Sequence, residues 1–107
     1  MNKMQASVWN TGKSHEIANT YGIRVGIKNR DQFFDQNWQE IKLEIDDKTY
    51  TFSLTPGFWR KCPEFRDSRE QVIRHWLLQY KTLQWNKGEP PKVELVSLGY
   101  GKFHLLS

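Results

Sequence analysis

Apolar and polar residues alternate along several short stretches of this chain, which is the period-two pattern of half-buried β-strands. The pattern is clearest in residues 41–54, where Asp46-Asp47-Lys48 separates two alternating runs and predicts a hairpin. A last hairpin is predicted around Gly99-Tyr100-Gly101. The predicted strands cover residues 6–10, 21–27, 41–45, 49–54, 93–98 and 102–106.

Two segments carry helical signals. Asn29 with Gln32 resembles a capping box and predicts a short helix of about two turns, from which Phe33, Phe34 and Trp38 pack inward. Ser68 with Gln71 forms a second such pattern. It precedes apolar residues at helical spacing, which predict the main helix over about residues 69–80. These apolar residues are Val72, Ile73, Trp76, Leu77 and Tyr80.

The segment between the central hairpin and the main helix contains Pro56, Gly57 and Pro63, so it is predicted to be a long, partly packed loop. The short connections favour antiparallel neighbours. The order of elements therefore predicts a mixed, mainly β fold, a small antiparallel pseudobarrel of about six strands with two helices. The expected core residues are Ile23, Val25, Leu43, Ile45, Phe52, Leu54, Ile73, Trp76 and Leu77.

The length of 107 residues fits one domain, and we expect residues 1–107 to form it, with the first few residues lacking fixed structure. Five Trp, six Phe and four Tyr supply large side chains for its core. The single cysteine, Cys62, excludes an internal disulfide framework and fits a reducing compartment. Because no stretch looks like a signal peptide or a run of about 18 apolar residues, we expect a cytoplasmic protein without a membrane partner.

The net charge of +4 is unevenly distributed along the chain. Residues 1–30 contain five basic and one acidic residue, residues 31–56 contain two and six, and residues 57–107 contain nine and five. A basic surface built from the first and last of these segments would favour a polyanion, whereas the acidic middle is expected to face elsewhere. Ordinary scatter of surface charge fits the same numbers.

Three stretches are similar to a known family. They are Asn10-Thr11-Gly12 with His15 before Tyr21-Gly22-Ile23, then Asp47 to Phe52, then Trp76-Leu77 leading through Gly88-Glu89 into Val93-Glu94-Leu95. With the order of elements, they resemble the pseudobarrel of plant B-three transcription-factor domains and of the DNA-binding effector domains of type II restriction endonucleases. The resemblance implies that residues 10–19 and residues 55–66 form two loops that grip the major groove of duplex DNA. It also implies that both loops face one concave surface.

The two loop segments contain the residue types that such a grip requires, cations for phosphates and amide or hydroxyl groups for base edges. Arg24, on the outward face of its strand, would extend the basic surface, and Trp59 beside Arg60 could stack on a sugar or a splayed base. The candidate DNA-binding residues are Asn10, Thr11, Lys13, Ser14, His15, Asn19, Arg24, Trp59, Arg60, Lys61 and Arg66. A structural explanation is open for each: Asn10-Thr11-Gly12 also fits a plain turn, and Phe58 or Trp59 also fits an anchor of the loop to the core.

We expect no enzymatic activity, no metal and no small-molecule cofactor, because Cys62 and the three histidines show no catalytic or ligand spacing. The expected function is non-enzymatic binding of duplex DNA by a bacterial or phage protein. Two alternatives remain at this stage. One is a protein-interaction module of a phage or defence system that uses the aromatic loop, and the other is a small barrel ribonuclease, whose site needs no linear motif.

Overall fold

The computed structural model describes residues 2–11, 20–68 and 70–106. Within these ranges the chain forms seven strands, two α-helices and one 3₁₀ turn. In chain order they are β1 Lys3–Asn10, β2 Tyr21–Arg24, α1 Ile27–Phe33, β3 Glu40–Ile45, β4 Lys48–Ser53, the 3₁₀ turn η2 Pro56–Trp59, β5 Glu64–Arg66, α2 Val72–Tyr80, β6 Lys92–Gly99 and β7 Lys102–Leu106.

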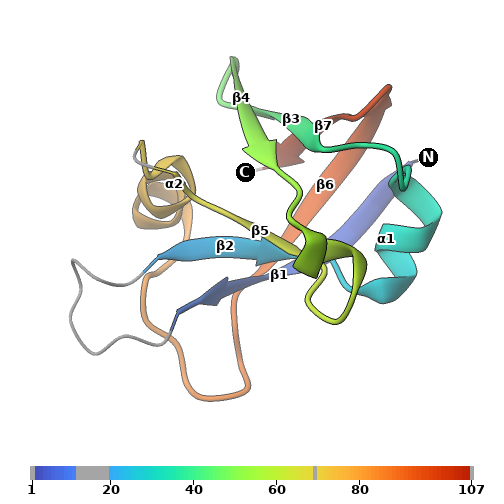
Figure 1. Cartoon of the computed structure of the whole chain (residues 1–107). Helices are drawn as coiled ribbons and strands as arrows, with labels where there is room; N and C mark the ends of the chain where they lie inside the picture. The colour runs from blue at the N-terminus through green and yellow to red at the C-terminus, as the bar shows by residue number, and fades with distance from the viewer. Residues whose placement is uncertain (1, 12–19, 69, 107) are drawn as a thin grey trace.

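The seven strands form one sheet that curls into a nearly closed barrel, in the order β4-β3-β7-β6-β1-β2-β5 (Figure 1). The predicted central hairpin is confirmed, and its turn places Asp46 and Asp47 at φ values of +48° and +70°, as a two-residue type I′ turn requires. The predicted last hairpin is also confirmed, with Tyr100 at φ +54°. The mainly β, barrel-like fold with two helices is therefore as predicted.

One pairing in the sheet is parallel. β3 and β7 run in the same direction, with Leu43 opposite Phe103 and Glu44 opposite His104. The prediction of an entirely antiparallel barrel is wrong at this ladder, because β3 and β7 are joined through α2, β6 and most of the barrel and not through a short turn. The parallel ladder joins the β3–β4 hairpin to the other five strands.

The strand β5 lies inside the segment that was predicted to be a loop. It pairs antiparallel with β2, with Gly22 opposite Arg66 and Arg24 opposite Glu64. Gly22 allows this approach, because a Cβ atom there would lie 2.4 Å from the Phe65 carbonyl oxygen and 2.6 Å from Trp9 Nε1. β4 and β5 are the two edge strands, and the gap between them, which we call the seam, is where the barrel is open.

Both predicted capping boxes are wrong in detail. Helix α1 begins at Ile27, because Gly26 takes φ +88° and ends the strand, so Asn29 lies inside the helix. Helix α2 begins at Val72, and neither Ser68 nor Gln71 caps it with a side chain. The carboxylate of Asp67 has that role, since Oδ1 accepts the Ile73 N–H at 2.7 Å and Oδ2 accepts the Arg74 N–H at 2.9 Å.

The core fills the inside of the barrel, between the sheet and the two helices. All nine residues predicted for the core are buried, each less than 10% exposed. Of the three aromatic residues expected to pack inward, Phe34, directly after α1, is buried, whereas Phe33 and Trp38 are partly buried and pack against the core. Ile27, which the alternating pattern had placed inside, is 54% exposed because it begins the helix and does not continue the strand. No helix of the described residues has the length and apolar character needed to cross a membrane.

Replacing Trp76 by alanine should lower the free energy of unfolding by about 3–5 kcal/mol, because this side chain is only 3% exposed in the core. A matched control on the same helix is Leu78→Ala, whose side chain is 56% exposed and whose loss should change stability by about 0.5 kcal/mol or less. Urea denaturation measures both. Equal effects of the two substitutions would contradict the orientation of α2.

Asp67 makes the stability depend on pH. Its burial, offset in part by the Ile73 and Arg74 N–H groups and the nearby His75, raises the pKa of the carboxyl above its ordinary value of 3.8. The folded state thus holds a proton that the unfolded chain releases at lower pH. The bound proton of Asp67 therefore stabilises the folded state. This stabilisation is complete below pH 3.8 and is lost as the pH rises through the folded-state pKa of Asp67.

The Asp67→Asn variant cannot titrate at this position, so it is the reference for that effect. The stability of the parent relative to this variant should fall as the pH is raised from 3.8 through the folded-state pKa. Asp67→Ala removes both acceptors and should cost about 0.5–2 kcal/mol near neutral pH. Urea titrations at a series of pH values measure these differences, and a parent that gains stability over Asp67→Asn across this range would contradict the sign.

Candidate nucleic-acid interface

The second loop segment contains a rigid turn. The Gly57 carbonyl oxygen accepts both the Arg60 N–H and the Cys62 N–H, each at 3.1 Å, which closes residues 57–62 into a compact unit that we call the basic turn. Phe58 is completely buried and fixes η2 in the core. Trp59 packs edge-on against Phe58 with ring centroids 5.0 Å apart, so it serves as an anchor of the loop.

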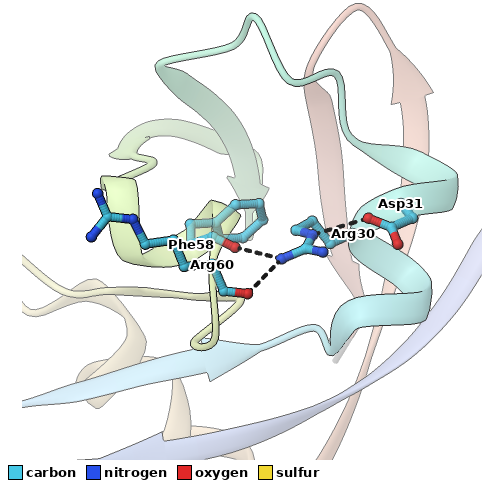
Figure 2. A network of polar contacts seen from close by, with 4 residues as sticks. All are labelled: Arg30, Asp31, Phe58 and Arg60. Carbon is cyan, nitrogen blue, oxygen red and sulfur yellow. Dashed lines mark hydrogen bonds and ion pairs between the residues drawn. The ribbon is translucent and has the colours of Figure 1, made fainter.

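Arg30 of α1 holds the basic turn from the side of the helix. Its Nη1 donates to the carbonyl oxygens of Phe58 at 3.2 Å and Arg60 at 3.0 Å, while Nε contacts Asp31 at 3.1 Å (Figure 2). Its side chain is only 11% exposed. The turn is therefore fixed to α1 by charge-assisted hydrogen bonds over a sequence distance of about 30 residues.

The cationic side chains of the basic turn are exposed. Figure 2 shows the Arg60 side chain extending away from Arg30, and Lys61 follows it on the exposed surface. Among the described residues, neither Arg60, Lys61 nor Arg66 has an acidic partner. A rigid backbone thus presents charges that no carboxylate of the described chain neutralises.

Arg24 is different from these three residues. Its Nε and Nη2 both lie 2.8 Å from Glu64 Oε2 on the neighbouring strand β5. This cross-strand ion pair gives Arg24 a structural role in the β2–β5 ladder and reduces its capacity to meet a phosphate.

The β2–β5 register places Thr20 and the basic turn at opposite ends of one ladder. Thr20 leads into the end of β2 that pairs with Arg66, whereas the basic turn leads into the end of β5 that pairs with Arg24. The expected placement of both loops on one concave surface depends on residues 12–19, outside the described residues, and stays a prediction. Antiparallel pairing puts only Thr20 and the basic turn at opposite ends of the β2–β5 ladder. Arg66 lies at the end nearer Thr20, and the ladder separates it from Arg60 and Lys61.

Four of the predicted residues of the first loop, Lys13, Ser14, His15 and Asn19, lie outside the described residues. The base of that loop is described. The Thr11 N–H donates to the Thr20 carbonyl oxygen at 3.1 Å, and the Thr20 N–H donates to Thr11 Oγ1 at 3.2 Å. The Thr11 hydroxyl is thus used to close the base of the loop, next to Asn10 at the end of β1.

The acidic turn lies far from the basic turn. Asp46 and Asp47 precede β4, and the basic turn follows it, so a strand of six residues, roughly 20 Å long, separates them. Asp46 accepts a hydrogen bond from the Tyr80 hydroxyl at 3.1 Å, which directs it toward α2. Asp46 and Asp47, with Lys48 beside them, thus lie at one end of β4, and Arg60 and Lys61 lie beyond the other end.

The described residues offer no group of three His, Cys, Asp or Glu side chains that could hold a metal ion. His104 Nδ1 lies 2.9 Å from Glu44 Oε1 on the neighbouring strand of the β3–β7 ladder. This histidine is therefore in a cross-strand contact on the outer face of the sheet. Cys62 is an exposed thiol at the end of the basic turn.

Sequence reasoning missed Arg30 and Asp67, which position the candidate interface and the helix beside it. Arg30 binds backbone carbonyls, and such contacts over 28 and 30 positions leave no pattern in the sequence. Asp67 immediately precedes Ser68, so a cap signal was present and was assigned to the wrong side chain.

Comparisons with protein-family models, with curated proteins and with solved structures find no match to this chain.

Replacing Arg30 by methionine should release the basic turn, because it removes both bonds to the carbonyl groups of Phe58 and Arg60. We expect a loss of about 1–3 kcal/mol in stability and faster amide hydrogen exchange at Arg60 and Cys62. Lys28→Met removes the same charge from an exposed position of the same helix. It should change neither the stability nor the amide exchange of Arg60 and Cys62. Unchanged exchange in the Arg30 variant would show that the turn does not depend on this residue.

Proposed function

We propose that this chain binds duplex DNA and catalyses no reaction, with the basic turn as its main contact to the phosphates. The observation that carries the proposal is the rigid presentation of Arg60 and Lys61, whose charges have no acidic partner among the described residues. Pre-organised cations bind phosphates with little ordering cost, and phosphate neutralisation supplies most of the affinity for a nucleic acid.

The β2–β5 ladder would form the floor of the interface, with the basic turn at one end and Thr11 and Thr20, which pair with each other, at the other. Four residues of β2 span roughly 13 Å, which is close to the width of about 12 Å of the DNA major groove. In this arrangement Arg60 and Lys61 contact one phosphate backbone and Arg66 lies toward the other. Asn10, beside the first loop, is the candidate for a base contact.

The distance between the Asp46-Asp47 turn and the basic turn supports an anionic partner. The acidic Asp46-Asp47 turn lies at the far end of β4, so a polyanion at the basic turn avoids it. The free thiol Cys62 at this surface fits a reducing compartment, and we place the protein in the cytoplasm of a bacterium or of a phage-infected cell.

A protein partner is the second candidate, and the open edge of β4 favours it. Two cavities, of about 480 and 570 Å³, follow this edge and share Thr51, Phe52 and Ser68. An exposed strand edge can pair with an extended peptide. The dependence on salt separates the two functions, because binding to phosphates releases counterions and strand pairing does not.

The double variant Arg60→Ala/Lys61→Ala should bind every duplex more weakly than the parent. The slope of log K against log[salt] should become shallower by about 0.9 for each phosphate contact that is lost. Fluorescence anisotropy with a labelled random duplex at several salt concentrations measures both quantities.

The matched control is Lys42→Ala/Lys48→Ala, which removes the same charge from the β3–β4 hairpin. This control should change the affinity and the slope much less. If the two double variants weaken binding equally, only the net charge matters and the basic turn is not the interface. If the Arg60/Lys61 variant binds as well as the parent at low salt, the proposed function is wrong.

A further inference from the structure

The seam between β4 and β5 contains a cavity of about 480 Å³, beside the basic turn. Gly57 and Cys62, the first and last residues of that turn, both line it. This volume lies within the range of about 300–1,000 Å³ in which proteins bind small organic groups. The cavity therefore adjoins the proposed DNA-binding surface and is large enough to hold part of a ligand.

Backbone hydrogen-bonding groups of both edge strands point into the seam. The two-residue turn makes Lys48, Tyr50 and Phe52 the residues of β4 that exchange hydrogen bonds with β3, so the N–H and C=O groups of Thr51 and Ser53 are directed outward. Pro63 and Asp67, which flank β5, bond to Val25 and Tyr21, and this alternation leaves the backbone of Arg66 facing the seam. A planar ligand with donors and acceptors on its rim could pair with either edge.

Aromatic side chains form the apolar part of the cavity. Phe52 and Phe65 meet across the seam with ring centroids 5.2 Å apart. Trp9 reaches the cavity over Gly22, and among the described residues its indole N–H has no hydrogen-bond acceptor. Such walls suit a flat aromatic group, because every nucleobase presents a π-face for stacking.

The charges around the cavity favour an anion. Arg66 lines it without an acidic partner among the described residues, and Arg60 and Lys61 lie between its lining residues Gly57 and Cys62. The two carboxylates of the lining are already engaged, Glu64 by Arg24 at 2.8 Å and Asp67 by the helix N–H groups. A phosphate could therefore lie on Arg66 while its base enters the seam.

We infer that the seam cavity accepts the base of an unpaired nucleotide in the bound DNA, so that the protein prefers duplexes with an extruded or bulged base. This inference rests on the proposed function. Base pairs and stacking hold a base inside a regular duplex, and an unpaired base can leave the stack at a lower cost.

The experiment compares three short duplexes of one sequence, namely a fully paired duplex, a duplex with a single bulged adenine, and a duplex with an abasic site in place of that adenine. We expect the bulged adenine to raise the affinity about tenfold over the paired duplex, and the abasic bulge to give no such gain. Anisotropy at fixed salt measures the affinities. Iodoacetamide labelling gives a local readout, because Cys62 is the only cysteine and lines the cavity.

The bulged adenine should protect Cys62 from labelling, whereas the paired and abasic duplexes should protect it less. Ser53→Phe should abolish the preference for the bulge and keep binding to the paired duplex, because Ser53 lines the cavity from β4 and lies outside the basic turn. Ser53→Ala is the control, since it adds no bulk at the same position. Thermal melts monitored by circular dichroism confirm that both variants fold.

Three outcomes would overturn the inference. Equal affinity for the three duplexes would show that the cavity does not accept a base, and it would not contradict the proposed function. An equal gain from the abasic bulge would show that the protein senses flexible DNA and not a base. Protection of Cys62 by an alternating Thr-Val peptide, with none by the bulged duplex, would assign the seam to a peptide strand. Failure of all three duplexes to bind at low salt would instead reject the proposed function.

Discussion

The parallel pairing of β3 with β7 is the constraint on which the rest of the barrel depends. It is the ladder that attaches the β3–β4 hairpin to the remaining five strands, and the Lys42 N–H extends it by donating to the Gly101 carbonyl oxygen at 2.9 Å. This pairing sets where β4 lies, and hence where the chain enters η2 and the basic turn. The position of the seam follows from it, because β4 and β5 remain as the two unpaired edges.

The basic turn combines a backbone held by hydrogen bonds with exposed cationic side chains. The guanidinium group of Arg30 donates hydrogen bonds to two backbone carbonyl groups, and these bonds fix the basic turn. The neighbouring side chains of Arg60 and Lys61 have no acidic partner among the described residues. Phe58 adds an anchor in the core. Residues 55–66 thus contain side chains that anchor the segment to the core, such as Trp59, and the exposed cations Arg60 and Lys61. Arg24, on β2, is paired with Glu64.

Local patterns predicted most of the fold. The two hairpins and the buried face of α2 depend on period-two or helical spacing within a few residues, and the structure confirms them. Features that depend on distant residues were missed. β5 has three residues in a segment with two prolines and exists because β2 pairs with it, and Gly22 permits that approach only in the folded barrel. Part of the candidate interface was located on residues 55–66. Its support by Arg30 could not be read from the sequence, because Arg30 bonds to carbonyl groups 28 and 30 positions away. The separation of the basic turn from Arg66 follows from the pairing of β2 with β5.

The most direct measurement of the central claim is a titration of the ¹⁵N-labelled protein with a random duplex, followed by amide chemical shifts. The account predicts that the largest changes fall on Arg60, Lys61 and Arg66 and on the base of the first loop at Asn10 and Thr11, while Asp46 and Asp47 remain unchanged. Changes centred on the Asp46-Asp47 turn, or no changes at low salt, would contradict it.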